Sequence, residues 1–325
     1  MSKTKKIIAI TSLALFFIAF VAVMVYYFGA SYKQFDKISS ANIVIPGLDT
    51  KFVPQGITYV QETDNFLISG YMSDSTPSRI YVVNKSSGDH IKYVTMSVDG
   101  SPYTLHAGGI TTYQNYLYVA GDKVVVRFDL GMLELAEHQG EITAIDSFQT
   151  GNGCDFLVTY NNQLIVGEFY KKDKYETPTA HHITTNNQTN YALSYIYNFN
   201  PANQYGLESL TPTGAISMPN QVQGMTFTKS GDIFLSTSYS IPSSMLYTYE
   251  NVLANPSEKT VTLNNTQVPL YILDSKVLKT SLKAPSMSEE AILVEDKVYL
   301  LFESNCKKYR FINRTRLSNV YALDI

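Results

Sequence analysis

The stretch QGITYVQETDNFLISGY at residues 55–71 has a counterpart of the same layout, QGMTFTKSGDIFLSTSY, at residues 223–239. In each, two short runs of alternating apolar residues flank a polar turn that contains Asp with Asn or Gly. Alternation with a period of two is typical of a half-buried β-strand, and such a turn joins two strands into a hairpin. The stretch therefore predicts a β-hairpin that recurs along the chain.

Three further segments share this pattern, which makes five repeats. They are GGITTYQNYLYVAGD from Gly108, DFLVTYNNQLIVGEF from Asp155 and EEAILVEDKVYLLFES from Glu289. The repeats start at 55, 108, 155, 223 and 289, so consecutive starts are 53, 47, 68 and 66 residues apart. This spacing fits a three- or four-stranded blade with its loops. One blade cannot bury both of its faces alone, so blades pack radially until a ring closes.

The repeats predict an all-β fold, a five-bladed β-propeller covering residues 42–325. The polar, turn-rich segment at about 176–220 is interpreted as an insertion, and a sixth, degenerate blade there stays open. We expect the strand NIVIPGLD at 42–49 to join the last blade beside SNVYALDI at 318–325. That pairing would close the ring.

The first 32 residues differ from the rest in composition. Lys3, Lys5 and Lys6 precede an uncharged stretch at 7–32, which exceeds the roughly 20 residues that a membrane-spanning helix needs. Its length and the lack of an A-x-A site favour an uncleaved anchor over a signal peptide. The lysines predict a cytoplasmic N-terminus. We therefore expect a single-pass cell-membrane protein with a linker at 33–41 and an extracellular propeller.

The composition also restricts the classes of partner and cofactor. Charged residues make up 16% of the chain and the net charge is −3, which gives no basic footprint for nucleic acid. Cys154 and Cys306 lie far apart in the sequence, which is typical of two separate buried thiols. No cofactor or metal motif is present in the sequence. The expected partners are the membrane and a cell-envelope polysaccharide or peptide, with no cofactor.

The (Q)G-[IM]-T motif at Gln55 and Gln223, with a later Ser-rich turn, resembles the first-strand motif of glutaminyl-cyclase-like five-bladed propellers. The match covers residues 53–83 and 221–249, and the rest of the chain agrees only as a repeat pattern. The layout is also similar to uncharacterised membrane-anchored extracytoplasmic propeller proteins of Gram-positive bacteria. The acidic residue of the cyclase type after the second strand of blade 1 is absent, because Gly70-Tyr71 stands there. This departure argues against cyclase activity.

Equivalent positions of the repeats converge at one mouth, because the innermost strands of a propeller all begin around its axis. The first such position holds Gln55, Gly108, Asp155, Gln223 and Glu289. The next position holds Gly56, Gly109, Phe156, Gly224 and Glu290. The ends of the second strands and the segment before the second repeat add Tyr71, Glu168, Tyr239, Glu303 and His106. The sequence therefore predicts an axial ring of amides and carboxylates.

Four interpretations of this ring are open. It can hydrogen-bond a polar ligand, a cell-wall glycan or peptide. The predicted ligand-binding residues are Gln55, His106, Asp155, Glu168, Gln223, Tyr239, Glu289 and Glu303. Asp155, Glu289 and Glu290 could instead supply oxygen ligands to a hard cation, although no calcium-loop motif is present in the sequence. The same acids, with His106 as a base, are the candidates for hydrolysis or for acyl or glycosyl transfer, including glutaminyl-cyclase-like chemistry. Finally, polar side chains could line a water-filled channel in a structural or assembly scaffold of the cell envelope.

Overall fold

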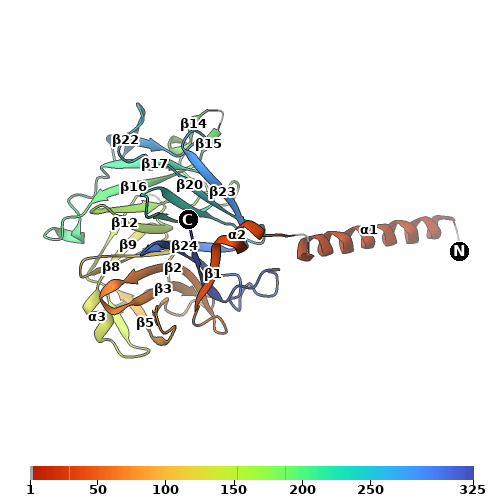
Figure 1. Cartoon of the computed structure of the whole chain (residues 1–325), viewed down its shortest axis with the longest axis horizontal. Helices are drawn as coiled ribbons and strands as arrows, with labels where there is room; N and C mark the ends of the chain where they lie inside the picture. The colour runs from red at the N-terminus through yellow and green to blue at the C-terminus, as the bar shows by residue number, and fades with distance from the viewer. Residues whose placement is uncertain (1–2, 29, 152, 187) are drawn as a thin grey trace.

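The computed structural model describes residues 3–28, 30–151, 153–186 and 188–325. Five main sheets gather into one body, from which helix α1 extends alone toward the N-terminus (Figure 1). We number these sheets as blades 1 to 5 in the chain order of their innermost strands. The α-helices of the described residues are α1 (Lys3–Phe28), α2 (Lys33–Ile38) and α3 (Leu130–Leu135).

Each blade is an antiparallel sheet built on one of the five repeats. Blade 1 contains β2 (Phe52–Val60), β3 (Asn65–Met72), β4 (Arg79–Asn84), β5 (His90–Val98) and β6 (Ser101–Pro102). Blade 2 contains β7 (Gly109–Tyr113), β8 (Tyr116–Gly121), β9 (Val124–Asp129) and β11 (Asp146–Gln149). Blade 3 contains β12 (Phe156–Tyr160), β13 (Gln163–Gly167), β16 (Ala192–Asn198) and β17 (Gly214–Met218). Blade 4 contains β18 (Val222–Phe227), β19 (Ile233–Thr237), β20 (Ser244–Tyr249) and β23 (Leu278–Ala284).

Blade 5 joins the two ends of the domain. It contains β24 (Ser288–Val294), β25 (Lys297–Phe302), β26 (Asn319–Leu323) and β1 (Ser39–Val44). Strand β1 pairs antiparallel with β26, with Ser39 opposite Leu323. The innermost strands contact one another in the cyclic order β2, β7, β12, β18, β24 and back to β2. The predictions of a five-bladed propeller and of its closure by the two chain ends are confirmed.

Segments from one blade also extend the neighbouring blade. β10 (Glu141–Thr143) lies between two strands of blade 2 in the sequence but pairs parallel with β5 of blade 1. β21 (Thr260–Leu263) and β22 (Thr266–Ile272) lie between two strands of blade 4, and β22 pairs parallel with β17 of blade 3. These pairings cover strand edges that would otherwise be open and hydrogen-bond adjacent blades at their periphery.

The segment 176–220 contributes largely to blade 3. It supplies β16 and β17, the third and fourth strands of that sheet, because the alternating YALSYIYNF buries Tyr195 and Tyr197 against the core. A short hairpin of β14 (Ile183–Thr185) and β15 (Gln188–Asn190) stands apart from the blade. In the described part of the chain there is no sheet that would make a sixth blade.

Helix α1 covers most of the uncharged N-terminal stretch, and in Figure 1 it points away from the propeller. Of the helices that the structure describes, none combines the length and the apolar character required to cross a membrane. The predicted transmembrane anchor is therefore not supported by the structure. Cys154 and Cys306 are both buried and free, as the spacing predicted.

Candidate functional site

A cavity of about 400 Å³ opens where the repeats converge. Every blade contributes to its wall, through the start of its innermost strand, the end of its second strand or a loop that follows. The side chains of most interest are Gln55, Tyr71, His106, Asp122, Asp155, Phe169, Lys174, Tyr175, Gln223, Tyr239, Glu303 and Tyr309. Six of the eight predicted ligand-binding residues thus line one cavity, and Glu168 and Glu289 do not.

Glu290 lies within the ring of innermost strands. One carboxylate oxygen accepts the backbone N–H of Ile57 at 2.8 Å and that of Ile110 at 3.1 Å, and the other accepts the N–H of Leu157 at 3.3 Å. These donors belong to β2, β7 and β12, so one side chain of blade 5 is hydrogen-bonded to blades 1, 2 and 3. Burial raises the pKa of Glu290 well above its usual range, against the lowering effect of the three N–H donors.

Three of the other repeats have glycine at the position equivalent to Glu290, and these glycines leave room for the Glu290 side chain. A Cβ on Gly109 would come within 2.5 Å of the Leu157 nitrogen, and one on Gly224 would come within 2.5 Å of the Glu290 Cα. A Cβ on Gly56 would approach a carboxylate oxygen of Glu290 to 3.0 Å. The Glu290 side chain therefore fills the propeller axis at the level of these glycines. Glu290 is 1% exposed and does not reach the cavity.

Glu303 is the carboxyl group of blade 5 that lines the cavity. Its Oε2 accepts a hydrogen bond from Gln55 Nε2 at 3.0 Å, and it is hydrogen-bonded to the carboxyl of Glu289 behind it. Burial raises the pKa of Glu303 to about 8, although the nearby Lys308 and the two hydrogen bonds lower it. Burial and the neighbouring Glu303 raise the pKa of Glu289 as well. Both carboxyl groups therefore favour the protonated form at neutral pH.

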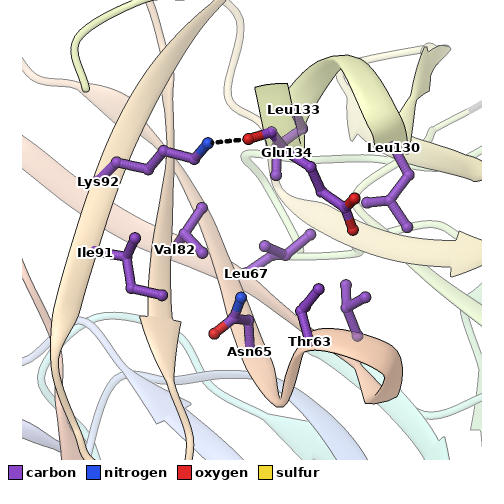
Figure 2. Close-up of a pocket in the computed structure, with 10 residues that line it drawn as sticks. Thr63, Asn65, Leu67, Val82, Ile91, Lys92, Leu130, Leu133 and Glu134 are labelled. Carbon is purple, nitrogen blue, oxygen red and sulfur yellow. Dashed lines mark hydrogen bonds between the residues drawn. The ribbon is translucent and has the colours of Figure 1, made fainter. Parts of the chain in front are cut away.

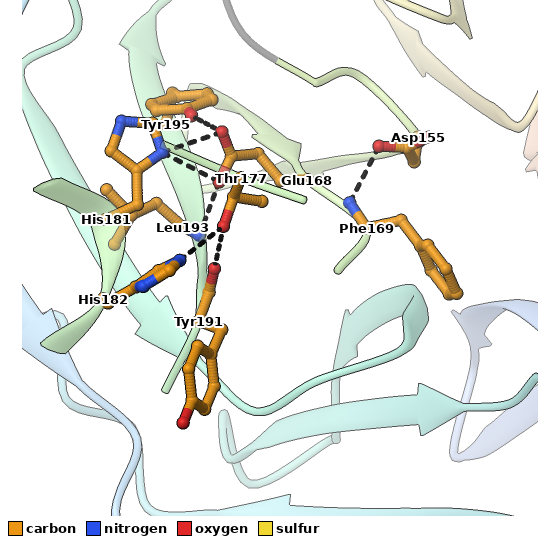
Figure 3. Close-up of polar contacts among 9 residues, drawn as sticks. All are labelled: Asp155, Glu168, Phe169, Thr177, His181, His182, Tyr191, Leu193 and Tyr195. Carbon is orange, nitrogen blue, oxygen red and sulfur yellow. Dashed lines mark hydrogen bonds and ion pairs between the residues drawn. The ribbon is translucent and has the colours of Figure 1, made fainter. Parts of the chain in front are cut away.

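Asp155 lies at the start of β12, where it is half-buried. Its Oδ2 accepts the backbone N–H of Phe169 at 2.8 Å, as Figure 3 shows. Burial raises the pKa of Asp155 to about 7, which the Phe169 N–H opposes and the charge of Glu168 reinforces. Asp155 thus gives the cavity a second carboxyl group that titrates near neutral pH.

Glu168 points away from the cavity into a buried polar cluster. It accepts hydrogen bonds from the Tyr195 hydroxyl and the Leu193 N–H, the latter at 3.0 Å, and its Oε1 lies 2.9 Å from His181 Nδ1 (Figure 3). Glu168 and His181 are 1% and 4% exposed. The cluster attaches the loop that carries His181 to blade 3. Sequence reasoning could not find this partner, because no local pattern links His181 to Glu168.

An aromatic wall lies at the blade 1 and blade 5 side of the cavity. The rings of Tyr71 and His106 stack at 4.5 Å between centroids, with an interplanar angle of 24°. The Tyr71 hydroxyl lies 3.2 Å from that of Tyr309 and accepts a hydrogen bond from Lys308 Nζ at 2.6 Å. Tyr309 comes from the loop between β25 and β26, outside the residues that the five repeats align. The sequence therefore offered no signal for it.

Asp122 is a site residue for which the sequence did offer a signal. It directly follows β8 and so completes the set of residues at the ends of the second strands, with Tyr71, Glu168, Tyr239 and Glu303. In contrast, Asp155, Glu289 and Glu290 are not gathered around one point. Among the residues that the structure describes, no three His, Cys, Asp or Glu side chains are grouped to hold a metal ion.

A second cavity, of about 210 Å³, lies between blade 1 and helix α3. Figure 2 shows Leu67, Val82 and Leu133 on its walls, with Lys92 donating to the backbone oxygen of Glu134 at 2.7 Å. Lys92 also donates to the backbone oxygen of Ala136, so it satisfies carbonyl groups at the C-terminal end of α3. Lys92 on the wall of this cavity thus supports the end of helix α3.

No protein-family model matches the chain, and no curated protein matches it. Solved structures of similar fold include the glutaminyl cyclase of Myxococcus xanthus, with 10% identity, a TM-score of 0.47, and coverage of 88% of this chain and 95% of that one. Another is the PQQ-bound aldose sugar dehydrogenase of Streptomyces coelicolor, with 13% identity, a TM-score of 0.45, and coverage of 88% and 97%. Likeness at this level does not identify an activity. The chain is a five-bladed propeller whose structural neighbours include a glutaminyl cyclase and other propeller proteins.

Proposed function

We propose that the domain binds a polar ligand, a cell-wall glycan or peptide, in the 400 Å³ cavity. The observation that carries this proposal is that all five blades contribute side chains to one cavity and that these differ from blade to blade. A volume of several hundred Å³ is typical of small-ligand sites. An asymmetric set of amides, carboxyls and tyrosines suits an asymmetric ligand. Tyrosine rings can also pack against the apolar faces of sugars.

Replacing Gln55 and Gln223 together by Ala is expected to weaken retention of the domain on purified cell walls about tenfold or more. Each amide can form one or two hydrogen bonds with a ligand, and each such bond contributes about 0.5–1.5 kcal/mol. Gln163→Ala is the matched control, because Gln163 bonds Asn198 in blade 3 and does not line the cavity. Co-sedimentation with walls measures the effect. Equal retention of the double variant and the control would contradict the proposal.

A second candidate function is supported by the carboxyl pair. Glu303 faces the cavity with its pKa raised to about 8 and is hydrogen-bonded to Glu289. A carboxylic acid that is protonated at neutral pH can act as a general acid in glycosyl or acyl transfer. In this reaction class, Glu303 donates a proton to the leaving group. Glu289 orients the Glu303 carboxyl through their hydrogen bond.

For this enzymatic alternative, Glu303→Gln should abolish release of soluble fragments from cell walls while retention on the walls persists. The amide has nearly the shape of the acid but cannot donate its proton to a leaving group. In the wild type, turnover should fall as the pH rises through about 8, because the acid form of Glu303 is then lost. Unchanged fragment release by the variant, or a rate that rises through that pH, would exclude this role.

The cellular location remains a prediction from the sequence. A position outside the cytoplasm is compatible with a wall ligand, and the alternative of a scaffold at the cell envelope would need no occupied cavity. Retention on walls that is insensitive to the cavity variants would favour the scaffold.

A further inference from the structure

Three aromatic rings pack against one another on one side of the cavity. The centroids of Phe169 and Tyr175 are 5.6 Å apart and nearly perpendicular, at 78°. The centroid of Tyr239 lies 6.2 Å from that of Phe169, at an interplanar angle of 39°, and 6.5 Å from that of Tyr175, at 75°. All three residues line the cavity. We call these three rings the aromatic cage, because an ammonium group is attracted to the face of an aromatic ring.

The protein's own ammonium groups lie against two rings of this cage, Tyr175 and Tyr239. Lys174 Nζ lies 5.1 Å from the centroid of Tyr175 and 5.4 Å from that of Tyr239, and it donates to the Tyr239 hydroxyl at 2.9 Å. The Lys171 ammonium adds a contact of 5.1 Å to the Tyr239 ring. Within the described residues, no carboxylate forms an ion pair with either lysine. The cage therefore holds a cation through ring and hydroxyl contacts alone.

The other walls of the cavity carry acidic groups that form no ion pair among the described residues. Asp122, Asp155 and Glu303 line it, and none of them forms an ion pair among the residues that the structure describes. Burial raises the pKa of Asp155 to about 7 and that of Glu303 to about 8. A cation that entered the cavity would favour the ionised form of both carboxyls.

We propose that the cavity takes a ligand bearing an ammonium group, which binds against Tyr175 and Tyr239 in place of Lys174. This inference rests on the proposed ligand-binding function and specifies the chemical class of the ligand. When the ligand is absent, the Lys174 ammonium takes the place of the ligand's cation against these rings. The ligand's cation makes the same ring contacts, in a cavity that Asp155 and Glu303 also line.

Displacement of Lys174 needs no change of the backbone. Lys171 and Tyr175 are bridged by two backbone hydrogen bonds, of 2.9 Å from the Lys171 N–H and 2.8 Å from the Tyr175 N–H. These bonds fix the turn that carries the cage. The Lys174 side chain is exposed and flexible, so it can swing into solvent at small cost.

Choline and its uncharged isostere 3,3-dimethyl-1-butanol are the probes that test the inference. They have nearly the same shape and differ in the permanent charge. Isothermal titration at pH 8 is expected to show choline binding about tenfold more tightly than the isostere. Tyr239→Leu should weaken choline binding about tenfold, and Tyr239→Phe should retain it because the ring is kept.

Lys174→Ala is expected to tighten choline binding about tenfold, since the internal competitor is removed. Lys308→Ala is the matched control. It removes the same charge near the same cavity, but its ammonium lies over Tyr71 and Tyr309, at 4.8 and 4.9 Å from their centroids. We expect this variant to change choline affinity less than threefold. If Lys174→Ala and Lys308→Ala changed choline affinity equally, the change would reflect only the loss of a positive charge near the cavity. That result would contradict the inference.

Two further outcomes would overturn the inference. One is equal affinity for choline and its isostere. The other is tighter binding of acetate than of choline, lost in both lysine variants, which would make the cavity an anion site. Wall retention of the double variant of Gln55 and Gln223 distinguishes a failure of the ammonium inference from a failure of the proposed function. If wall retention depends on these glutamines but choline does not bind, only the ammonium inference is wrong. If choline binds but the domain is not retained on walls, only the proposal of a wall ligand is wrong.

Discussion

Glu290→Ala is expected to lower the free energy of unfolding by about 4 kcal/mol or more, the largest effect of any single substitution that we predict. The variant leaves the N–H groups of Ile57, Ile110 and Leu157 buried without an acceptor. Each such group costs about 1–3 kcal/mol, and the lost side-chain volume adds a cavity between the blades. Urea unfolding followed by far-UV circular dichroism measures the change, since the chain has no Trp.

Two further variants make this prediction specific. Glu290→Gln has the same shape and keeps one oxygen for two of the N–H groups, but its NH₂ opposes the third donor, so we expect a loss of about 1–2 kcal/mol. Glu62→Ala changes an exposed glutamate in a surface turn and should stay within about 0.5 kcal/mol of the wild type. A urea midpoint of Glu290→Ala equal to that of Glu62→Ala would show that the axial carboxyl does not hold the blades together.

Deletion of residues 318–325 is expected to abolish cooperative folding of the domain. It removes β26, which lies between β25 and β1 in blade 5, and leaves both partners with open edges. It also removes Val320 and Leu323, which are fully buried. At about 1.5–3 kcal/mol for each buried side chain, plus the lost strand pairing, the cost is comparable with the whole stability of a typical domain. Thermal unfolding by circular dichroism should show no transition.

The synthetic peptide SNVYALDI, added to the deletion variant, supplies the missing strand and should restore a melting transition. Removal of Ile325 alone is the control, because this residue is 41% exposed and follows the last strand. A deletion variant that melts at the wild-type temperature would contradict closure of the ring through β26.

The sequence by itself determined the number and kind of the blades, because each depends on local patterns. Alternating apolar residues and Asp, Asn or Gly turns specify each hairpin within about 15 residues, as at Gln55 and Gln223. Radial packing then places equivalent positions together, so the repeat pattern alone assigns Gln55, Asp155 and Gln223 to one mouth. Asp122 could have been assigned to this mouth by the same rule.

Only the tertiary structure decided which of the converging acids face the cavity. Glu168 and Glu303 stand at equivalent places after their second strands, yet Glu168 turns to His181 whereas Glu303 turns to Gln55. The parallel pairings of β10 and β22 with neighbouring blades likewise join segments far apart in the chain. Burial, not residue type, sets the pKa of Glu303 and Asp155. Such contacts and desolvation depend on what the closed ring brings around each side chain, and no local sequence pattern encodes them.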